Sequence, residues 1–231
     1  MLHACELAAR ARRANRVLVA TDDRRVVEAV SQAGFEAAMT PSELPSGTDR
    51  VAAVAETLEA EIVVGLQADE PFLEPEDVDA LIAAVEAASG SEVPCIATLA
   101  SPLRDTDDWH DPNVVKVVTD LAGRALYFSR SPIPYLRGAG LLAMPPEGPV
   151  PSKARAHVGV YAWRMGSLAE FGRLPHSELE RVEGLEQLRA LESGWRIIVL
   201  DAAGEPFGID TKEDLERAES WFDAARGERS G

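Results

Sequence analysis

Short apolar runs alternate with helical periodicities along this 231-residue chain. The run at 62–66 reads Ile-Val-Val-Gly-Leu, which is typical of a strand buried on both faces of a parallel sheet. Similar runs predict strands at 16–20, 35–39, 94–100, 156–163 and 195–200. Apolar residues three and four positions apart predict helices at 1–14, 24–33, 51–58, 75–88 and 177–191. This alternation predicts an α/β fold with a mostly parallel, Rossmann-like sheet flanked by helices.

The pattern changes in the middle of the chain. Residues 113–119 and 124–130 alternate around a turn at 120–123 and predict an inserted antiparallel β-hairpin. Residues 131–154 are rich in proline and glycine and predict a mobile loop. We interpret 1–231 as one domain, in which 113–163 forms a hairpin and loop subregion.

Charge and cysteine content narrow the function classes. The formal net charge of −16 argues against nucleic acid or an anionic membrane as a partner, and a phosphorylated substrate would need local cations or a metal ion. Cys5 and Cys95 lie far apart and favour buried free thiols in a reducing compartment, with a lone disulfide as the alternative. Neither a membrane-spanning apolar run nor a secretory leader is visible, so we expect a cytoplasmic protein.

Two aspartates follow predicted extended segments. Asp69 comes after the run at 62–66, and open α/β sheets bind ligands at the carboxyl ends of their strands. A carboxylate there suits Mg²⁺, although a helix-capping Asp in a tight turn fits equally well. Asp210 ends a later extended segment; Thr211 and Asp214 resemble a capping box, which accounts for Thr211 but not for Asp210.

Three further segments carry candidate chemistry. The small residues before the helix at 51–58 could let a ligand approach backbone N–H groups, or form an ordinary cap with Thr48 as the capping side chain. Alternation in 156–163 places His157 and Tyr161 on one strand face. On the predicted helix 177–191, residues three and four apart share one side, either as a site or as a solvated acidic face. Those residues are Glu183, Glu186 and Gln187.

Eight motifs, spread over nearly the whole chain, carry a family resemblance when taken together. They are VATDD at 19–23, SGTDR at 46–50, QADEP at 67–71, DPNVVKVV at 111–118, ALYFSRSPIP at 125–134, HVGVYAW at 157–163, LEQLR at 185–189 and GIDTKEDL at 208–215. In this order they resemble the 3-deoxy-D-manno-octulosonate (Kdo) cytidylyltransferases, the CMP-Kdo synthetases. The resemblance implies a nucleotidyltransferase that moves CMP from CTP to the anomeric hydroxyl of a 2-keto-3-deoxy sugar acid, with Mg²⁺, in lipopolysaccharide biosynthesis. It also implies a homodimer, with the hairpin at 113–130 as part of the contact.

The resemblance also implies residue roles. Asp69 and Asp210 would hold Mg²⁺ and serve as the catalytic carboxylates. The residues that would line the nucleotide pocket are Ser46, Gly47, Thr48, Arg50 and Ala68. The residues that would hold the sugar acid are Gln67, Arg130, His157, Tyr161, Glu186 and Gln187, with Arg130 facing its carboxylate.

Departures from the family pattern add further expectations. The family opens with a strand and a phosphate-binding loop, whereas Met1 aligns with its first helix, so we expect two exposed strand edges and a true start upstream of Met1. Ala68 stands where the family usually has Gly, and Leu44 where it usually has His. These differences leave open another acidic acceptor, such as a different ulosonic acid or a phosphonate. Because the phosphate-binding loop of the family pattern is missing, an inactive nucleotide-binding relative is an alternative interpretation.

Overall fold

The computed structural model describes residues 1–44, 46–68, 70, 72–90, 92–137, 154–204, 206, 208, 209, 212, 216 and 218. The helices are α1 (Leu2–Arg10), α2 (Arg24–Gln32), α3 (Gly47–Ala55), α4 (Pro75–Ala87), α5 (Thr106–His110), α6 (Met165–Phe171), α7 (Glu178–Glu183) and α8 (Gln187–Glu192). The strands are β1 (Leu18–Thr21), β2 (Glu36–Met39), β3 (Ile62–Gly65), β4 (Cys95–Pro102), β5 (Lys116–Thr119), β6 (Ala125–Ser129), β7 (Arg155–Arg164) and β8 (Arg196–Asp201). None of the helices among the described residues is long and apolar enough to cross a membrane.

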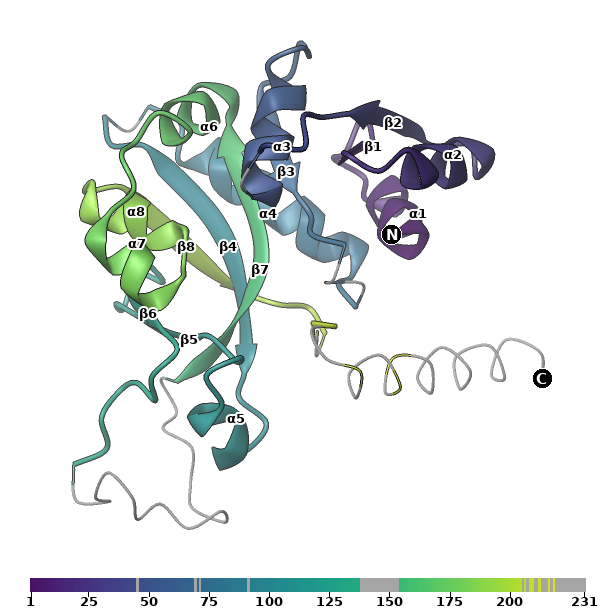
Figure 1. The fold of residues 1–231 in the computed structure, drawn as a ribbon. Helices are drawn as coiled ribbons and strands as arrows, with labels where there is room; N and C mark the ends of the chain where they lie inside the picture. Colours follow the sequence, from purple (N-terminus) through teal and green to yellow (C-terminus); the bar gives the residue numbers. More distant parts are fainter. Residues whose placement is uncertain are drawn as a thin grey trace.

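Six strands form the central sheet, in the order β6-β5-β7-β4-β8, with β3 on the other part of β7 (Figure 1). The predicted α/β class, the flanking helices and the inserted hairpin β5–β6 are confirmed. Strands β4 and β8 are parallel, whereas β7 runs antiparallel to both β3 and β4 and makes the sheet mixed. An antiparallel neighbour needs no crossover helix, in contrast to a parallel one.

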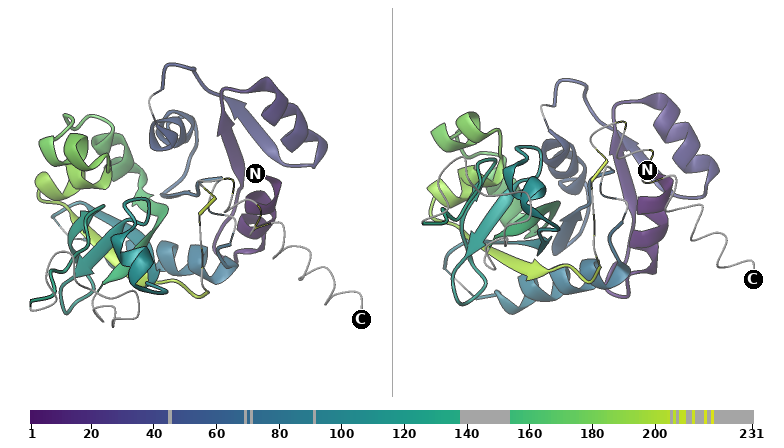
Figure 2. Two further views of the ribbon diagram at one scale, coloured as in Figure 1. Left: turned by 60° about the horizontal axis from the view of Figure 1, so that its bottom comes forward. Right: turned by 90° about the horizontal axis from the view of Figure 1, so that it is seen from below.

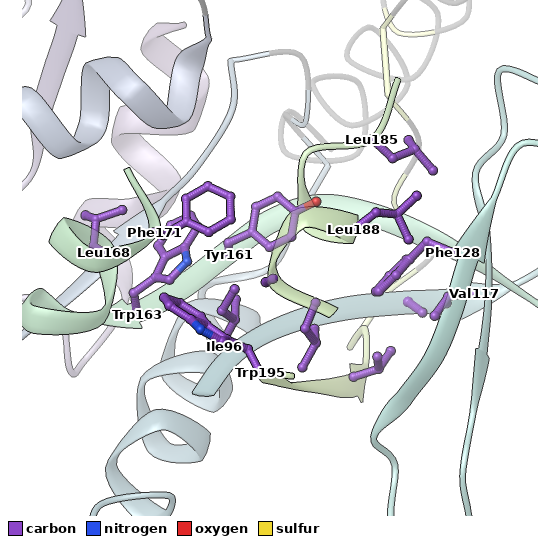
Figure 3. Packing of buried hydrophobic residues seen from close by; sticks show 14 of the residues in the cluster. Ile96, Val117, Phe128, Tyr161, Trp163, Leu168, Phe171, Leu185, Leu188 and Trp195 are labelled. Atoms are coloured by element: carbon purple, nitrogen blue, oxygen red, sulfur yellow. The ribbon is translucent and has the colours of Figure 1, made fainter. Parts of the chain in front are cut away.

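Helices cover both faces of this sheet (Figure 2). One core lies under α6, α7 and α8 and contains Phe128, Tyr161, Trp163 and Trp195. The other core lies under α4 and contains Leu81, Leu99 and other aliphatic side chains. In the first core, the ring of Tyr161 lies between Trp163 and Leu188 (Figure 3). Each face of the sheet is therefore covered by its own helices, as expected for an α/β fold.

The sheet is divided at its other end, as the family pattern led us to expect. Strands β1 and β2 pair in parallel as a separate two-stranded sheet. A groove of about 830 Å³ lies between β1 and β3, lined by apolar and charged residues that include parts of both strands and of α1, α3 and α4. The prediction that the strand at 62–66 is buried on both faces is wrong, because Ile62, Val63 and Val64 are only half-buried. Within the described residues, β3 pairs with β7 alone, so its other edge faces this groove.

Two local predictions also need correction. The predicted helix 177–191 is broken at Gly184, whose φ of 65° ends α7 in the left-handed conformation that glycine adopts readily. Glu183 and Glu186 therefore do not share one side of a helix. At α3 the capping side chain is Ser46 rather than Thr48, because its hydroxyl accepts the hydrogen bond from the backbone N–H of Asp49.

Both cysteines are buried free thiols, which confirms that interpretation over the lone disulfide. The loop predicted at 131–154 has neither helix nor strand at 131–137 and 154, and its remaining residues lie outside the described part. Thr211 and Asp214, which resemble a capping box, also lie outside the described residues.

Candidate active site

The N-terminus of α3 and the end of β3 meet at one pair of residues. A Cβ added to Gly47 would lie 2.5 Å from Oε1 of Gln67, so the absence of a side chain at residue 47 is what allows this close approach. Ser46 caps the helix beside this contact, and Ala68 is exposed directly after Gln67. The structure therefore brings together Gly47, a candidate nucleotide residue, and Gln67, a candidate sugar-acid residue, which lie 20 positions apart in the sequence.

Arg50 links α3 to the ends of β1 and β2. Its Nη1 donates to Thr40 Oγ1 and to the carbonyl of Pro41, both at 2.9 Å, and its Nη2 donates to Asp22 at the same distance. These bonds use the guanidinium to fix the loop that follows β2. Its role in the nucleotide pocket stays a prediction.

Thr48 connects the nucleotide side to the predicted acceptor residues. Its hydroxyl donates to Oε1 of Glu186, which precedes α8. Burial raises the pKa of Glu186, while the Thr48 hydrogen bond acts in the opposite direction. Gln187 is buried in the first turn of α8. Residues 138 positions apart in the sequence are thus in direct contact.

A row of aromatic rings runs along β7 and confirms the predicted shared face. The ring of His157 packs edge-on against Phe128 at 4.9 Å and lies 5.5 Å from Tyr161, and Tyr161 lies 5.4 Å from Trp163. Burial raises the pKa of Tyr161 well above its ordinary value. The hydroxyl of Tyr161 therefore stays protonated at neutral pH.

His157 is held as a neutral ring. The Thr98 hydroxyl lies 2.7 Å from the carbonyl of Val160 and donates to it, so it must accept from Nε2 of His157 at 3.0 Å. Burial lowers the pKa of His157 to about 3, which favours the uncharged imidazole. A neutral imidazole and a neutral phenol suit the hydroxyls of a ligand better than its anionic group.

Arg130 follows β6 and is positioned by neutral acceptors. Its Nε donates to the carbonyl of Glu183 at 2.8 Å and its Nη1 donates to the carbonyl of Pro112 at 2.9 Å. Its backbone N–H donates to the Glu183 carboxylate, which also accepts from Ser129. Within the described part of the chain, the Arg130 guanidinium forms no ion pair and its Nη2 forms no hydrogen bond. A fixed guanidinium with an unused edge is suited to bind a carboxylate.

The predicted metal ligands Asp69 and Asp210 both lie outside the described residues, so their convergence stays a prediction. Among the residues that are described, no group of three or more His, Cys, Asp or Glu side chains could hold a metal ion. Glu70, the described residue after Asp69, is hydrogen-bonded to Gln67 and to β7. The Glu70 N–H donates to the carbonyl of Gln67 at 3.3 Å, and Oε1 of Glu70 accepts from the Gly159 N–H at 2.9 Å.

Sequence reasoning missed two residues that position this site. Thr98 orients His157, and Lys116 is fully buried between β6 and β7. A signal was available for Lys116, because a lysine among four valines at 114–118 interrupts an apolar strand. No comparable signal marks Thr98. Glu183 was a candidate from the sequence, and the structure shows its carboxylate at the end of β6.

Comparisons with known proteins agree with this geometry. Residues 1–197 match the sequence model of a family described as cytidylyltransferase. The chain is 49% identical over 218 residues to the 3-deoxy-manno-octulosonate cytidylyltransferase of Anaeromyxobacter sp. (strain Fw109-5), covering 94% of this chain and 83% of that protein. It is 45% identical over 219 residues to the same enzyme of Geobacter sulfurreducens, covering 93% and 85%.

Solved structures give the same result. A CMP:2-keto-3-deoxy-manno-octonic acid synthetase complexed with CTP superposes with a TM-score of 0.85 at 37% identity, covering 97% of this chain and 87% of that one. A 4-diphosphocytidyl-2C-methyl-D-erythritol synthase from Anaerococcus prevotii superposes with a TM-score of 0.59 at 11% identity, which shows a shared fold only.

Proposed function

The chain belongs to the cytidylyltransferase family, among the 3-deoxy-manno-octulosonate cytidylyltransferases, and on this premise we propose that it transfers CMP from CTP to the anomeric hydroxyl of 3-deoxy-D-manno-octulosonate (Kdo) and releases pyrophosphate. One structural observation carries the acceptor assignment. Arg130 presents a fixed guanidinium without an ion pair among the described residues, in a protein whose formal net charge is −16. An anionic ligand is the natural partner for such a group.

The acceptor residues divide by charge. Arg130 binds the carboxylate of the sugar acid, and the neutral His157 and Tyr161 hydrogen-bond to its hydroxyls. Gln67, Glu186 and Gln187 complete this side of the site. Arg130 comes two residues after Phe128, whose ring contacts His157, so the groups for the carboxylate and for the hydroxyls come from neighbouring parts of the sheet.

Ser46, Gly47, Thr48, Arg50 and Ala68 form the nucleotide side. The Thr48–Glu186 hydrogen bond ties the two sides together, which fixes the distance between the two substrates. The anomeric oxygen attacks the α-phosphorus of CTP in line with the departing pyrophosphate, so one P–O bond forms, another breaks, and the hydroxyl proton is released. The protein contributes mainly position and charge neutralisation.

Asp69 and Asp210 are the proposed ligands of Mg²⁺, which suits carboxylate oxygens and would neutralise charge on the phosphates when bound. Support for Asp69 comes from its anchored neighbours, because Glu70 is tied to Gln67 and to Gly159. These contacts position Gln67 and Glu70, the described residues nearest to Asp69.

The decisive experiment measures pyrophosphate release from CTP and Kdo in the presence of Mg²⁺. Release with both substrates is expected. The acceptor assignment is abandoned if no ulosonic acid supports release, and the base assignment is abandoned if UTP supports it and CTP does not. Binding of both ligands without release would indicate an inactive binding protein. A guanidinium also binds a phosphonate, so a phosphonate is the second candidate acceptor to test.

We also propose a cytoplasmic homodimer. Two buried free thiols and the use of CTP support the compartment. For the dimer, β6 is the edge strand of the six-stranded sheet and Leu126 on it is 62% exposed. We expect L126K to shift the protein to a monomer in sedimentation velocity, whereas an unchanged sedimentation coefficient would place the contact elsewhere.

A further inference from the structure

Lys116 is a fully buried lysine in a strand that would otherwise be apolar. Its exposed fraction is 0%, and its neighbours in the sheet are Ser129 on β6 and Ala156 on β7. Lysine is almost never fully buried unless its ammonium group has partners, because desolvating the charge is costly. A well-packed apolar side chain would serve the stability of β5 at least as well. The presence of an amine here calls for another explanation.

The partners of the amine lie at two points around Arg130. Nζ of Lys116 donates to the carbonyl of Arg130 and to the carbonyl of Asp111, each at 2.7 Å. The next residue after Asp111 is Pro112, whose carbonyl accepts from Nη1 of Arg130. Lys116 therefore fixes both the backbone of Arg130 and the segment that orients its guanidinium.

Glu183 completes the frame from the opposite side. Its carboxylate accepts from the Arg130 N–H at 2.9 Å, and its carbonyl accepts from Nε at 2.8 Å. Two carbonyls and one carboxylate thus accept hydrogen bonds from Arg130, and the carboxylate is used by the backbone rather than by the guanidinium. The positive charge of Arg130 stays available, and the charge of Lys116 lies beside it.

We infer that Lys116 is a positioning residue for the anionic group of the acceptor: it holds Arg130 and the 111–112 segment so that the free edge of the guanidinium faces the acid. This inference rests on the proposed function, since it requires Arg130 to bind the acceptor carboxylate. It assigns Lys116 no contact with the substrate. A purely structural lysine would affect folding, and both substrates equally, whereas a positioning lysine affects the acid selectively.

The charge of Lys116 adds a second signature. Burial lowers its pKa to about 8, opposed by Asp111, while Arg130 lowers it further and Glu183 and Asp108 raise it. When the amine loses its proton it keeps two N–H donors for the two carbonyls, but the positive potential at the anion site falls. The pKa of Lys116 in the folded protein, about 8, lies below its ordinary value of 10.5. Between these two values the unfolded chain binds the proton more tightly, so the free energy of unfolding rises with pH. Over the same range the affinity for the acid falls.

The experiment compares K116M, K116Q and the control V117A by calorimetric titration with Kdo and, separately, with CTP. Val117 is a buried neighbour on the same strand with no polar contact to Arg130, so V117A lowers the melting temperature without changing the affinity for Kdo. K116M is expected to weaken Kdo binding by roughly tenfold or more, because the two carbonyls lose their donor. CTP binding should stay within about twofold of the wild type, because distant sites couple weakly.

Several results would overturn the inference. The inference is wrong if K116M binds Kdo as tightly as the wild type does. It is also wrong if V117A and K116M lower the melting temperature equally and lose the same Kdo affinity. If K116M does not fold, K116Q and the pH dependence of the wild type decide. The wild type must bind Kdo more weakly above a pH of about 8, and K116Q must show no such change. A wild type that binds no ulosonic acid would overturn the proposed function itself, and this inference with it.

Discussion

The two sides of this molecule are held together by different kinds of interaction. On the proposed acceptor side (β5, β6, β7, α7 and α8), Arg189 and Glu180 form a buried ion pair, with side-chain exposures of 6% and 10%. On the proposed nucleotide side (α1, α2, α3, β1 and β2), the Arg16–Glu36 pair has exposures of 51% and 55%. Exposed pairs contribute little, whereas breaking a buried pair leaves an uncompensated charge.

The sheet shows the same contrast. Strands β5, β6 and β7 form one continuous ladder on the acceptor side. On the nucleotide side, the groove separates the β1–β2 pair from β3. The acceptor side is therefore preorganised by its own hydrogen bonds, and the nucleotide side has the weaker internal support among the described residues. Preorganisation is what a catalyst based on positioning requires.

The largest expected effect tests this contrast in stability. R189M leaves Glu180 buried without its cation and should lower the free energy of unfolding by about 3 kcal/mol. R16M breaks an exposed pair and should change it little. Urea denaturation of both variants gives the comparison, and equal effects would refute it.

The Arg189–Glu180 pair also makes the stability of the fold depend on pH. Burial raises the pKa of Glu180, but hydrogen bonds from Arg189 and His176 outweigh it and lower the pKa below its ordinary value. A carboxyl group with a lowered pKa stabilises the fold above its unfolded pKa and loses that contribution as the pH falls through the folded value. Acid denaturation should therefore begin at a higher pH in wild type than in a variant whose buried pair is replaced by apolar residues.

The next effect concerns the acceptor. R130M should weaken Kdo binding by about a hundredfold, because a charge-assisted, bidentate contact is lost, and should leave CTP binding nearly unchanged. The matched control is R124A, since Arg124 lies on the same hairpin and pairs with Asp120 at the surface. Calorimetry on both variants is the measurement. If R124A and R130M bind Kdo equally well, the carboxylate assignment is wrong.

A smaller effect is expected at the junction of α3 and β3. G47A introduces a methyl group 2.5 Å from the end of the Gln67 side chain, which must move. Because that side chain is flexible, we expect about a tenfold loss of CTP affinity rather than misfolding. G166A is the control, since a Cβ there meets nothing within 4 Å. Unchanged CTP binding in G47A would mean that this junction does not shape the nucleotide pocket.

The smallest expected effect is that His157 causes no change in Kdo affinity with pH. With its pKa lowered to about 3, His157 stays neutral, so Kdo affinity should show no step between about pH 5 and 7.5 from this residue. Its contribution to stability is lost as the pH falls from its ordinary pKa of 6.5 towards 3, because the unfolded chain then binds the proton more tightly. A step near pH 6.5 that disappears in H157N would contradict this description.

Prediction from the sequence succeeded where a local pattern was sufficient. The alternation at 156–163 predicted the face shared by His157 and Tyr161, and the periodicity at 24–33 predicted α2. Prediction failed where a tertiary neighbour decided. The helix expected at 177–191 breaks at Gly184, where the turn brings Glu183 to Arg130.

The sequence by itself determined the α/β class, most of the strands and helices, and the family, because apolar periodicity and residue motifs are written along the chain. Only the tertiary structure decided that Thr48 contacts Glu186, that Thr98 fixes the proton of His157, and that Lys116 supports Arg130. These contacts join residues far apart in sequence, and their partners depend on which strands become neighbours. Local patterns carry no information on that choice, since it is made by packing of the whole sheet.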